Sequence, residues 1–317
     1  MSPADELHLV TGGAGFIGSN LARALLEEGV RVRVLDDFST GRKENLEGIE
    51  ADLDLIEGDV RDAAAARDAV AGAAVVYHQA AIPSVSRSVE DPVTSHLVNA
   101  GGTLNLLVAA RDAGVRRFVY ASSSSAYGQT EVMPIVEDTP PNPLSPYAVA
   151  KLAGEHYCRA FFASYGFSTV SLRYFNVFGP RQDPSSEYSA LIPRFAVAIL
   201  KGEAPTIYGD GEQSRDFTFI ADVVQANRRA AEAGEEAGGQ WFNVGQGGRT
   251  TVNELLGMFH RIEPGDHPAA VHGPPRVGEA RHSQADISKA GEVLGYAPQV
   301  SLEEGVRRTL DWFRDRL

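Results

Sequence analysis

Thr11-Gly12-Gly13-Ala14-Gly15-Phe16-Ile17-Gly18 is the stretch of sequence that determines the fold class. It ends a short apolar run, Leu7–Thr11, which predicts a strand, and it leads into residues 15–28, whose apolar spacing predicts an amphipathic helix. The glycines at 12, 15 and 18 remove Cβ atoms from the turn, so that a pyrophosphate can approach the amides at the helix N-terminus. The stretch therefore predicts the first strand–turn–helix unit of a dinucleotide-binding fold.

The same alternation continues through the first half of the chain. Apolar runs that predict further strands occupy residues 30–36, 53–56, 75–78, 118–121 and 169–174. Between them lie stretches with helical spacing, including the alanine-rich residues 63–74. Strands separated by helices predict an α/β fold with a doubly wound parallel (Rossmann) sheet.

A carboxylate ends the second of these strands. Asp36 follows Gly18 by 18 residues, which places it where it can accept hydrogen bonds from the ribose hydroxyls of adenosine. Because a carboxylate there repels a 2′-phosphate, NAD is favoured over NADP as the cofactor. Asp37 is the neighbouring candidate, and a solvated loop is the alternative for both aspartates. Asp59 and Val60 follow the third strand and are candidates for the adenine edge, although a plain strand end fits them equally well.

The residue pattern changes beyond about residue 176, where Gly and Pro become frequent and the apolar runs become shorter. This pattern predicts a smaller α/β part rich in loops, which is where folds of this kind often hold their substrates. We expect residues 1–175, with a return segment around 216–246, to form the NAD-binding Rossmann domain. Residues 176–215 and 247–317 are expected to form a second, smaller substrate domain.

Composition restricts the class of protein. The 317 residues carry a formal net charge of −13, which argues against a nucleic-acid partner or an anionic membrane surface, since phosphate groups require a basic face. The single cysteine, Cys158, rules out an internal disulfide, and the eight histidines show no metal-ligand spacing, so no metal is expected. No apolar run approaches the ~20 residues that span a bilayer, and no signal pattern opens the chain, so we expect a cytoplasmic protein.

The pattern that most clearly indicates a catalytic site is a Tyr-x-x-x-Lys pair. Ser122-Ser123-Ser124-Ser125 closes the expected strand 118–121, at the sheet edge where doubly wound folds bind ligands. Farther along the chain, Tyr147 and Lys151 stand at i and i+4 of an expected helix and share one face. Tyrosine has an ordinary pKa of about 10, and a nearby ammonium group together with NAD⁺ favours the phenolate. The pattern predicts that Tyr147 takes a proton from a substrate hydroxyl held by a serine, while a hydride leaves for nicotinamide.

With these residues, the chain resembles the UDP-hexose 4-epimerases of the extended short-chain dehydrogenase/reductase family over essentially its whole length. The matching pieces in the first half are residues 11–18, 77–81, 98–99, 121–128 and 145–151. Those in the second half are residues 172–180, 209–211, 214–217, 275–276 and 285–290. The resemblance implies NAD as cofactor, a UDP-sugar as substrate, and a homodimer joined by the Tyr147 helix and a helix over residues 93–113.

The resemblance also implies roles for individual residues. Ser123, Tyr147 and Lys151 are implied to form the catalytic triad. The residues implied to contact the cofactor are Gly12, Gly15, Phe16, Ile17, Gly18, Asp36, Asp37, Asp59, Val60, Gln79, Ala80, Ala81, Asn99, Tyr147, Lys151 and Tyr174. Those implied to hold the UDP-sugar are Ser84, Ser124, Ser125, Tyr147, Asn176, Arg215, Arg276 and Ser283. A surface ion pair is the alternative for each arginine taken singly.

Three serine positions bear on the reaction and on the substrate. Family members that dehydrate a sugar carry acidic residues directly after the catalytic hydroxyl, whereas Ser124 and Ser125 occupy those places here, so elimination is disfavoured. Ser283 stands where epimerases restricted to glucose and galactose carry a bulky Tyr. A small residue leaves room beside the sugar C2, so we expect interconversion of UDP-GlcNAc and UDP-GalNAc, together with UDP-Glc and UDP-Gal. A small loop residue without influence on the substrate is the alternative for Ser283.

Two other functions stay open at this point. One is a different enzyme of the same family: a UDP-glucuronate 4-epimerase or decarboxylase, or another nucleotide-sugar oxidoreductase. A glucuronate enzyme needs a cation near the sugar C6, and the sequence does not place one. The other is a non-catalytic NAD-binding sensor, which has no need of Tyr147 and Lys151.

Overall fold

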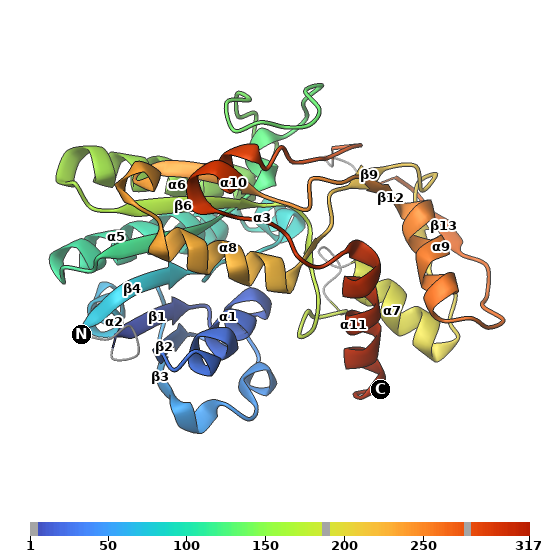
Figure 1. Cartoon of the computed structure of the whole chain (residues 1–317), viewed down its shortest axis with the longest axis horizontal. Helices are drawn as coiled ribbons and strands as arrows, with labels where there is room; N and C mark the ends of the chain where they lie inside the picture. The colour runs from blue at the N-terminus through green and yellow to red at the C-terminus, as the bar shows by residue number, and fades with distance from the viewer. Residues whose placement is uncertain (1–5, 186–190, 276–279) are drawn as a thin grey trace.

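The central element of the fold is a seven-stranded parallel sheet (Figure 1). The computed structural model of the chain describes residues 6–185, 191–275 and 280–317, and the strands follow the order β11-β6-β5-β4-β1-β2-β3. Their bounds are β1 (Leu7–Thr11), β2 (Arg31–Asp36), β3 (Leu53–Glu57), β4 (Ala73–His78), β5 (Arg117–Ser123), β6 (Thr169–Tyr174) and β11 (Gln240–Val244). The order reverses between β1 and β4, and doubly wound sheets bind ligands beyond the carboxyl ends of the strands at such a switch point. The predicted α/β class with a doubly wound parallel sheet is confirmed.

The strands form close to where the apolar runs predicted them. The strands expected at 75–78 and 118–121 are each longer in the structure, where they become β4 and β5. The helix expected over residues 63–74 was wrong at its end, since α2 (Ala63–Val70) stops earlier. Gly72 follows with a left-handed φ of 73°, and β4 begins at the next residue.

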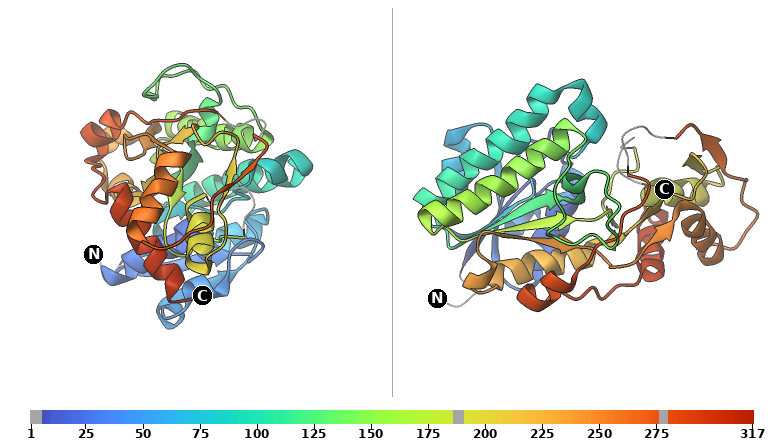
Figure 2. Two further views of the ribbon diagram at one scale, coloured as in Figure 1. Left: turned by 90° about the vertical axis from the view of Figure 1, so that its right-hand side faces the viewer. Right: turned by 90° about the horizontal axis from the view of Figure 1, so that it is seen from above.

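Helices cover both faces of the sheet (Figure 2). On one face lie α1 (Phe16–Glu27) and α8 (Ile220–Glu232), and on the other lie α2, α5 (Thr103–Asp112) and α6 (Pro146–Tyr165). Successive strand residues therefore enter different hydrophobic cores: Leu9 packs on the α5–α6 side and Val10 on the α1–α8 side. Burial of both faces explains why these strands appear in the sequence as continuous apolar runs.

The helix expected over residues 93–113 is a composite. It consists of α4 (Pro92–His96), a π-helical segment (Leu97–Gly102) and α5, which follow one another without a break, and α3 (Val85–Glu90) precedes it. These helices pack against α6. The N-terminus of α6 is capped by Ser145, whose Oγ accepts a hydrogen bond from the N–H of Ala148 at 3.2 Å. This cap fixes where the helix begins, one residue before Tyr147.

Beyond β6 the chain alternates between the sheet and a second group of helices. Helix α8 and strand β11 return to the sheet, whereas α7 (Leu191–Lys201), α9 (Val252–Ile262) and α11 (Leu302–Arg314) pack together at the right of Figure 1. The remaining elements are short: β7 (Val177–Phe178), β8 (Thr206–Tyr208), β9 (Ser214–Arg215), β10 (Thr218–Phe219), β12 (Thr250–Thr251), β13 (Val271–Gly273) and α10 (Ser288–Leu294). One hydrophobic core extends from the sheet to Phe195, Phe259 and Leu310, so the two parts of the molecule pack closely.

Two negative findings apply to the residues that the structure describes. Among them, no helix combines the length and the apolar composition that crossing a membrane requires. Nor do any three of their His, Cys, Asp or Glu side chains gather in a way that could hold a metal ion.

Candidate active site

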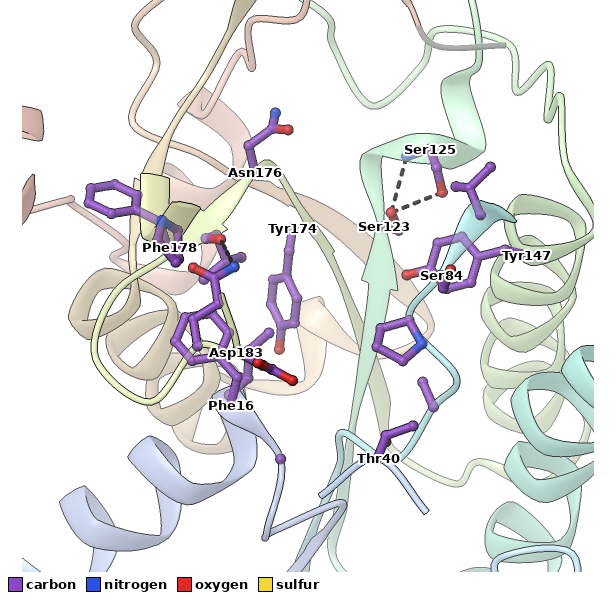
Figure 3. Close-up of a pocket in the computed structure, with 18 of the residues that line it drawn as sticks. Phe16, Thr40, Ser84, Ser123, Ser125, Tyr147, Tyr174, Asn176, Phe178 and Asp183 are labelled. Carbon is purple, nitrogen blue, oxygen red and sulfur yellow. Dashed lines mark hydrogen bonds between the residues drawn. The ribbon is translucent and has the colours of Figure 1, made fainter. Parts of the chain in front are cut away.

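A large cavity lies along the carboxyl edge of the sheet and has a volume of about 1610 Å³. Its lining comes from the β1–α1 turn, from the ends of β4, β5 and β6, and from segments 206–217 and 280–283. In Figure 3, Ser123, Ser125 and Tyr147 lie on one side of this space and Asn176 and Phe178 on the other. Small-molecule pockets typically enclose about 300–1,000 Å³, so this cavity has room for more than one ligand.

The β1–α1 turn forms one end of the cavity. Gly12 adopts a φ of 66°, and its carbonyl oxygen accepts a hydrogen bond from the N–H of Gly15 at 3.0 Å. A Cβ on Gly18 would collide with that same carbonyl, so the predicted need for glycine at both positions has a direct steric cause. No side chain caps the N-terminus of α1, and Phe16 and Ile17 line the cavity. The first amides of α1 are therefore suited to an anion.

Asp36 lies beside this turn, and two main-chain hydrogen bonds fix the orientation of its carboxylate. One carboxylate oxygen accepts a hydrogen bond from the N–H of Ala14 and the other from the N–H of Phe38, both at 2.8 Å. Burial raises the pKa of Asp36, and these two hydrogen bonds oppose that rise. Asp37 also lines the cavity and accepts hydrogen bonds from the N–H and Oγ of Ser39. Both aspartates are thus at the cavity, as predicted.

Another part of the cavity lining comes from residues after β3 and β4 and from the end of β6. Val60, Gln79, Ala80, Ala81 and Tyr174 all line the cavity. The Tyr174 hydroxyl lies 3.3 Å from Gln79 Oε1 and 3.0 Å from Asn227 Oδ1, which holds the ring in place. These five predicted positions are brought together by the structure.

Three predicted residues do not line the cavity, although the structure describes them: Asp59, Asn99 and Lys151. Asp59 is engaged by the guanidinium of Arg61, with Nη2 2.5 Å from Oδ2. Asn99 is buried and brackets the main chain of Ile82, accepting from its N–H at 2.8 Å and donating to its carbonyl at 3.2 Å. Asn99 therefore shapes the wall, since Ile82 itself faces the cavity. Direct contact of Asp59 and Asn99 with a cofactor is not supported by this geometry.

The catalytic candidates meet where β5 ends and α6 begins. Ser123 Oγ accepts hydrogen bonds from the N–H of Ser125 at 3.2 Å and from its hydroxyl at 2.9 Å, as Figure 3 shows. Ser123, Ser124, Ser125 and Tyr147 line the cavity. Lys151 is buried one helical turn after Tyr147 and donates from Nζ to the carbonyl of Ala121 at 2.8 Å.

Burial acts on both members of the Tyr-x-x-x-Lys pair. It raises the pKa of the Tyr147 phenol, an effect that a hydrogen bond with Ser123 opposes. It also lowers the pKa of Lys151 to about 7, an effect that the negative charge of Glu155 opposes. Burial therefore disfavours the charged forms of both groups, and a cationic partner would favour the phenolate of Tyr147.

The opposite wall carries the predicted sugar-nucleotide residues. Asn176 Nδ2 donates to Ser283 Oγ at 3.3 Å, and the N–H of Ser283 donates to the carbonyl of Ser214 at 3.1 Å. Arg215 Nη1 donates to the carbonyls of Ser214 and Arg281, both at 3.0 Å. Segment 280–283 is thus pinned along β9, and this pairing places Ser283 and Arg215 in the same wall. Arg276 lies outside the described residues.

Ser84 lies at the start of α3 and lines the cavity. Its Oγ accepts a hydrogen bond from the N–H of Arg87 at 3.1 Å, which leaves the hydroxyl proton available to a ligand. Arg87 itself lines the cavity and was not predicted, although it stands three residues after Ser84 on the same helix. Tyr208 and Phe217 were also missed; Phe217 belongs to segment 214–217, and that match was the signal for it.

Comparison with known proteins finds similar sequences over most of this chain. The sequence model described as the NAD dependent epimerase/dehydratase family matches residues 8–245. A UDP-glucose 4-epimerase of Mycolicibacterium smegmatis is 44% identical over 97% of this chain and 98% of its own length.

Solved structures agree with this comparison. The UDP-N-acetylglucosamine 4-epimerase of Methanobrevibacter ruminantium M1, in complex with UDP-N-acetylmuramic acid, superposes with a TM-score of 0.94 at 38% identity, over 99% of each chain. The UDP-glucose 4-epimerase of Thermotoga maritima, with UDP-glucose, gives a TM-score of 0.92 at 40% identity, over 98% of this chain and 99% of that one.

Proposed function

The chain belongs to the NAD-dependent epimerase/dehydratase family, and we propose that it inverts the configuration at C4 of UDP-hexoses. The observation that carries the proposal is the meeting of Ser123, Tyr147 and Lys151 at the carboxyl edge of the sheet, next to the dinucleotide turn. The residues after Ser123 are serines, so the site lacks the adjacent acids that the family's dehydrating members use for elimination.

The cofactor end of the cavity fits NAD. The uncapped N-terminus of α1 offers N–H groups to a pyrophosphate, and the fixed carboxylate of Asp36 offers acceptors to ribose hydroxyls. The same carboxylate would repel a 2′-phosphate, which favours NAD over NADP. NAD, when bound, would accept the hydride from C4 of the sugar and would give the same hydride back.

In the proposed reaction, Tyr147 takes the proton of the C4 hydroxyl while Ser123 Oγ holds that oxygen by a hydrogen bond. Loss of this proton and of the C4 hydride leaves a 4-keto sugar. The sugar then turns within the cavity, so that the hydride returns to its other face and Tyr147 gives the proton back to O4. Nothing is consumed in the cycle, and the product is the C4 epimer.

The nucleotide is the part of the substrate that must stay fixed while the sugar turns. Asn176 and Arg215 line the wall opposite Tyr147 and are the proposed anchors, and the family resemblance adds Arg276. A guanidinium pairs well with diphosphate oxygens, because its N–H groups match two acceptors at once. Contacts between Arg215 and main-chain carbonyls give the side chain a defined direction.

The size of the residue at position 283 supports activity on N-acetylated sugars. The Ser283 hydroxyl lies 3.3 Å from Asn176 Nδ2 and lines the cavity, so a bulkier residue there would intrude on the space beside the substrate. We therefore propose that the enzyme converts UDP-GlcNAc and UDP-GalNAc and also accepts UDP-Glc and UDP-Gal. Removing bulk admits an N-acetyl group without excluding a hydroxyl.

A homodimer is proposed from an apolar surface on α3, α4, the start of the π-helical segment and α6. Val89, Val93 and Leu97 are 65%, 66% and 47% exposed, and on α6 Val149 is 51% exposed. A group of exposed aliphatic side chains on packed helices is typical of a protein–protein interface. Light scattering on the purified protein should give twice the monomer mass, and Val93→Glu should reduce it to that of one chain.

A glucuronate enzyme is the second candidate function, and the position of Arg87 favours it. This exposed arginine lines the cavity one turn after Ser84, so it offers a cation that the sequence alone did not place. Product analysis with UDP-glucuronate tests this alternative directly.

The decisive experiment is incubation of the purified protein with UDP-GlcNAc and, separately, with UDP-Glc, without added reductant. The C4 epimers are separated by chromatography while absorbance at 340 nm (about the NADH maximum) is recorded. We expect UDP-GalNAc and UDP-Gal to form without accumulation of NADH. Conversion of UDP-Glc alone would overturn the substrate proposal, and no epimer from either sugar would overturn the proposed function.

A further inference from the structure

A buried ion pair lies directly behind the catalytic residues. Glu155 is on α6, one helical turn after Lys151, and Arg173 is on β6. Arg173 donates from Nε to Oε1 of Glu155 at 2.8 Å and from Nη2 to Oε2 at 2.6 Å. The two side chains are 2% and 1% exposed, for Arg173 and Glu155 respectively. This is a bidentate pair removed from water.

The pair connects the helix of Tyr147 to both strands at the site. Glu155 also accepts a hydrogen bond from the hydroxyl of Ser122, and Ser122 and Arg173 are register partners on β5 and β6. The next register partners along these strands are Ser123 and Tyr174, and both face the cavity. One carboxylate therefore ties α6 to the two strand ends that carry site residues.

Structural stability alone is a weak reason for charges in this place. A buried ion pair loses the hydration of both ions, and replacing such pairs by apolar residues of similar volume is often neutral or stabilising. Arg173 is already surrounded by aromatic rings, with its guanidinium 4.4 Å from the Tyr127 ring centroid and 5.3 Å from that of Trp241. Apolar packing could hold these elements together, so the charges suggest an electrostatic role.

Lys151 is the group on which the charge of Glu155 acts. Around its ammonium lie Glu155 on α6, Tyr120 on β5 and His78 on β4, with Arg173 beyond the carboxylate. Tyr147 stands one helical turn before Lys151 on α6. His78 is hydrogen-bonded at both ring nitrogens, to Thr11 and Thr103, and burial lowers its pKa to about 3. Burial raises the pKa of Tyr120 well above its usual value.

His78 and Tyr120 are therefore both uncharged near neutral pH. Among the described residues around Lys151, Glu155 is the acid whose negative charge acts on the ammonium. Its negative charge counteracts the desolvation of the ammonium, and the two hydrogen bonds from Arg173 fix the orientation of that carboxylate.

We propose that Glu155 and Arg173 are positioning residues that keep Lys151 cationic and α6 in register with Ser123, an inference that rests on the proposed acid–base role of Tyr147. Neither Glu155 nor Arg173 lines the cavity. The pair acts through Lys151, whose positive charge is what allows Tyr147 to work as a base.

The test uses two variants and a matched control in the full-length protein. Glu155→Gln keeps the shape and removes the charge. The double variant Glu155→Leu/Arg173→Met removes both charges, and it is expected to fold because apolar replacement of a buried pair is generally tolerated. Asp222→Asn is the control, since Asp222 is a buried acid on α8 that accepts hydrogen bonds from the N–H groups of Gln299 and Val300 and does not line the cavity.

For each protein, the melting temperature, the amount of bound NAD and kcat as a function of pH are measured. We expect the double variant to melt near the wild-type temperature, to bind NAD, and to lose about 10- to 100-fold in kcat, within the range of acid–base contributions. The control should lose less than about threefold, as expected for a change that leaves the acid–base groups in place.

The pH profile of kcat should shift in one direction when Glu155 is removed. Glu155 raises the pKa of Lys151, so without Glu155 the lysine loses its proton at lower pH. The fall of activity on the alkaline side should therefore begin about 1 pH unit lower, the smallest shift typical of a nearby opposite charge. A purely structural pair would leave this limb where it is in the wild type.

The outcomes separate this inference from the proposed function. A folded double variant with wild-type kcat and an unchanged alkaline limb, next to an active wild type and an inactive Tyr147→Phe, would overturn the positioning role alone. An inactive wild type, or a fully active Tyr147→Phe, would overturn the proposed function itself.

Discussion

The two walls of the cavity are built in different ways. The wall formed by β5 and α6 is supported from behind by buried hydrogen bonds, in which Lys151 donates to the carbonyl of Ala121 and Arg173 donates to Glu155. The wall formed by segments 206–217 and 280–283 is more open, and its ion pair between Arg281 and Asp210 joins side chains that are 60% and 54% exposed. Exposed ion pairs contribute only about 0–1 kcal/mol, so this pair adds little to the main-chain hydrogen bonds that join segment 280–283 to β9.

From this difference we infer that one wall carries out the chemical step and the other selects the substrate. Proton and hydride transfer require atoms held within fractions of an ångström, which a buried network provides. Choice of substrate requires a surface that can vary without disturbing the chemistry, which a loop wall provides. We therefore expect substitutions in the first wall to lower kcat, and substitutions in the second to change KM or the preferred sugar.

The largest effect should come from Tyr147→Phe in the first wall. Removing the phenol oxygen removes the proposed base, so kcat should fall about 10³-fold or more, within the range for a positioned proton-transfer group. Rates of epimer formation measure this, with circular dichroism and NAD content as controls for folding. A folded, NAD-bound variant with more than about a tenth of the wild-type kcat would be too active for the proposed role of Tyr147.

Asp36→Asn tests whether the cofactor end of the cavity, like the wall formed by β5 and α6, depends on a fixed polar side chain. The change keeps the shape but removes the negative charge, so NAD should bind about 10- to 100-fold more weakly, as expected for hydrogen bonds to a charged group. NADP binding should be less affected, because the repulsion of its 2′-phosphate is relieved. Titration of the apoprotein with both dinucleotides measures this, and an unchanged preference for NAD would argue against ribose recognition by Asp36.

Arg215→Ala tests the second wall. Loss of a charge-assisted contact to the diphosphate should raise KM about 10- to 30-fold and leave kcat within about threefold. Steady-state kinetics with UDP-Glc separate the two constants. Arg229→Ala, on an exposed part of α8 away from the cavity, is the matched control. A fall in kcat without a change in KM would contradict the assignment of substrate binding to the second wall and of the chemical step to the first.

The smallest effect is expected at Ser283, and it should be selective. Ser283→Tyr adds bulk beside Asn176, so kcat/KM for UDP-GlcNAc should fall about 10-fold relative to that for UDP-Glc, the usual scale for steric overpacking. Ser283→Ala, which adds no bulk, should keep the ratio within about twofold. Equal losses on both sugars in Ser283→Tyr would remove the basis for N-acetyl tolerance at this position.

The two walls also differ in how far the sequence predicted them. The Tyr147–Lys151 relation is local, because an i, i+4 pair on a helix shares a face whatever the rest of the fold does. The glycine turn and Asp36 were likewise predictable, since strand, turn and helix follow one another in the chain. These elements formed where they were expected.

The second wall depends on contacts between distant parts of the chain. The N–H of Ser214 donates to the carbonyl of Arg281, and the Ser283 N–H donates to the Ser214 carbonyl. No spacing or periodicity in the sequence indicates this pairing, so Arg215 and Ser283 could be assigned only through resemblance to the family. The same limit applies to Arg173 and Glu155, which meet only because β6 lies next to β5 and under α6.

The measurement that tests the central claim most directly uses UDP-[4-²H]glucose in ordinary water. If one site removes the C4 hydride and returns it to the other face, deuterium should remain at C4 of the UDP-galactose formed, at every extent of conversion and without net formation of NADH. Protium at C4 of the product, or an epimer that appears only when external NADH is supplied, would contradict a reaction in which the hydride never leaves the site.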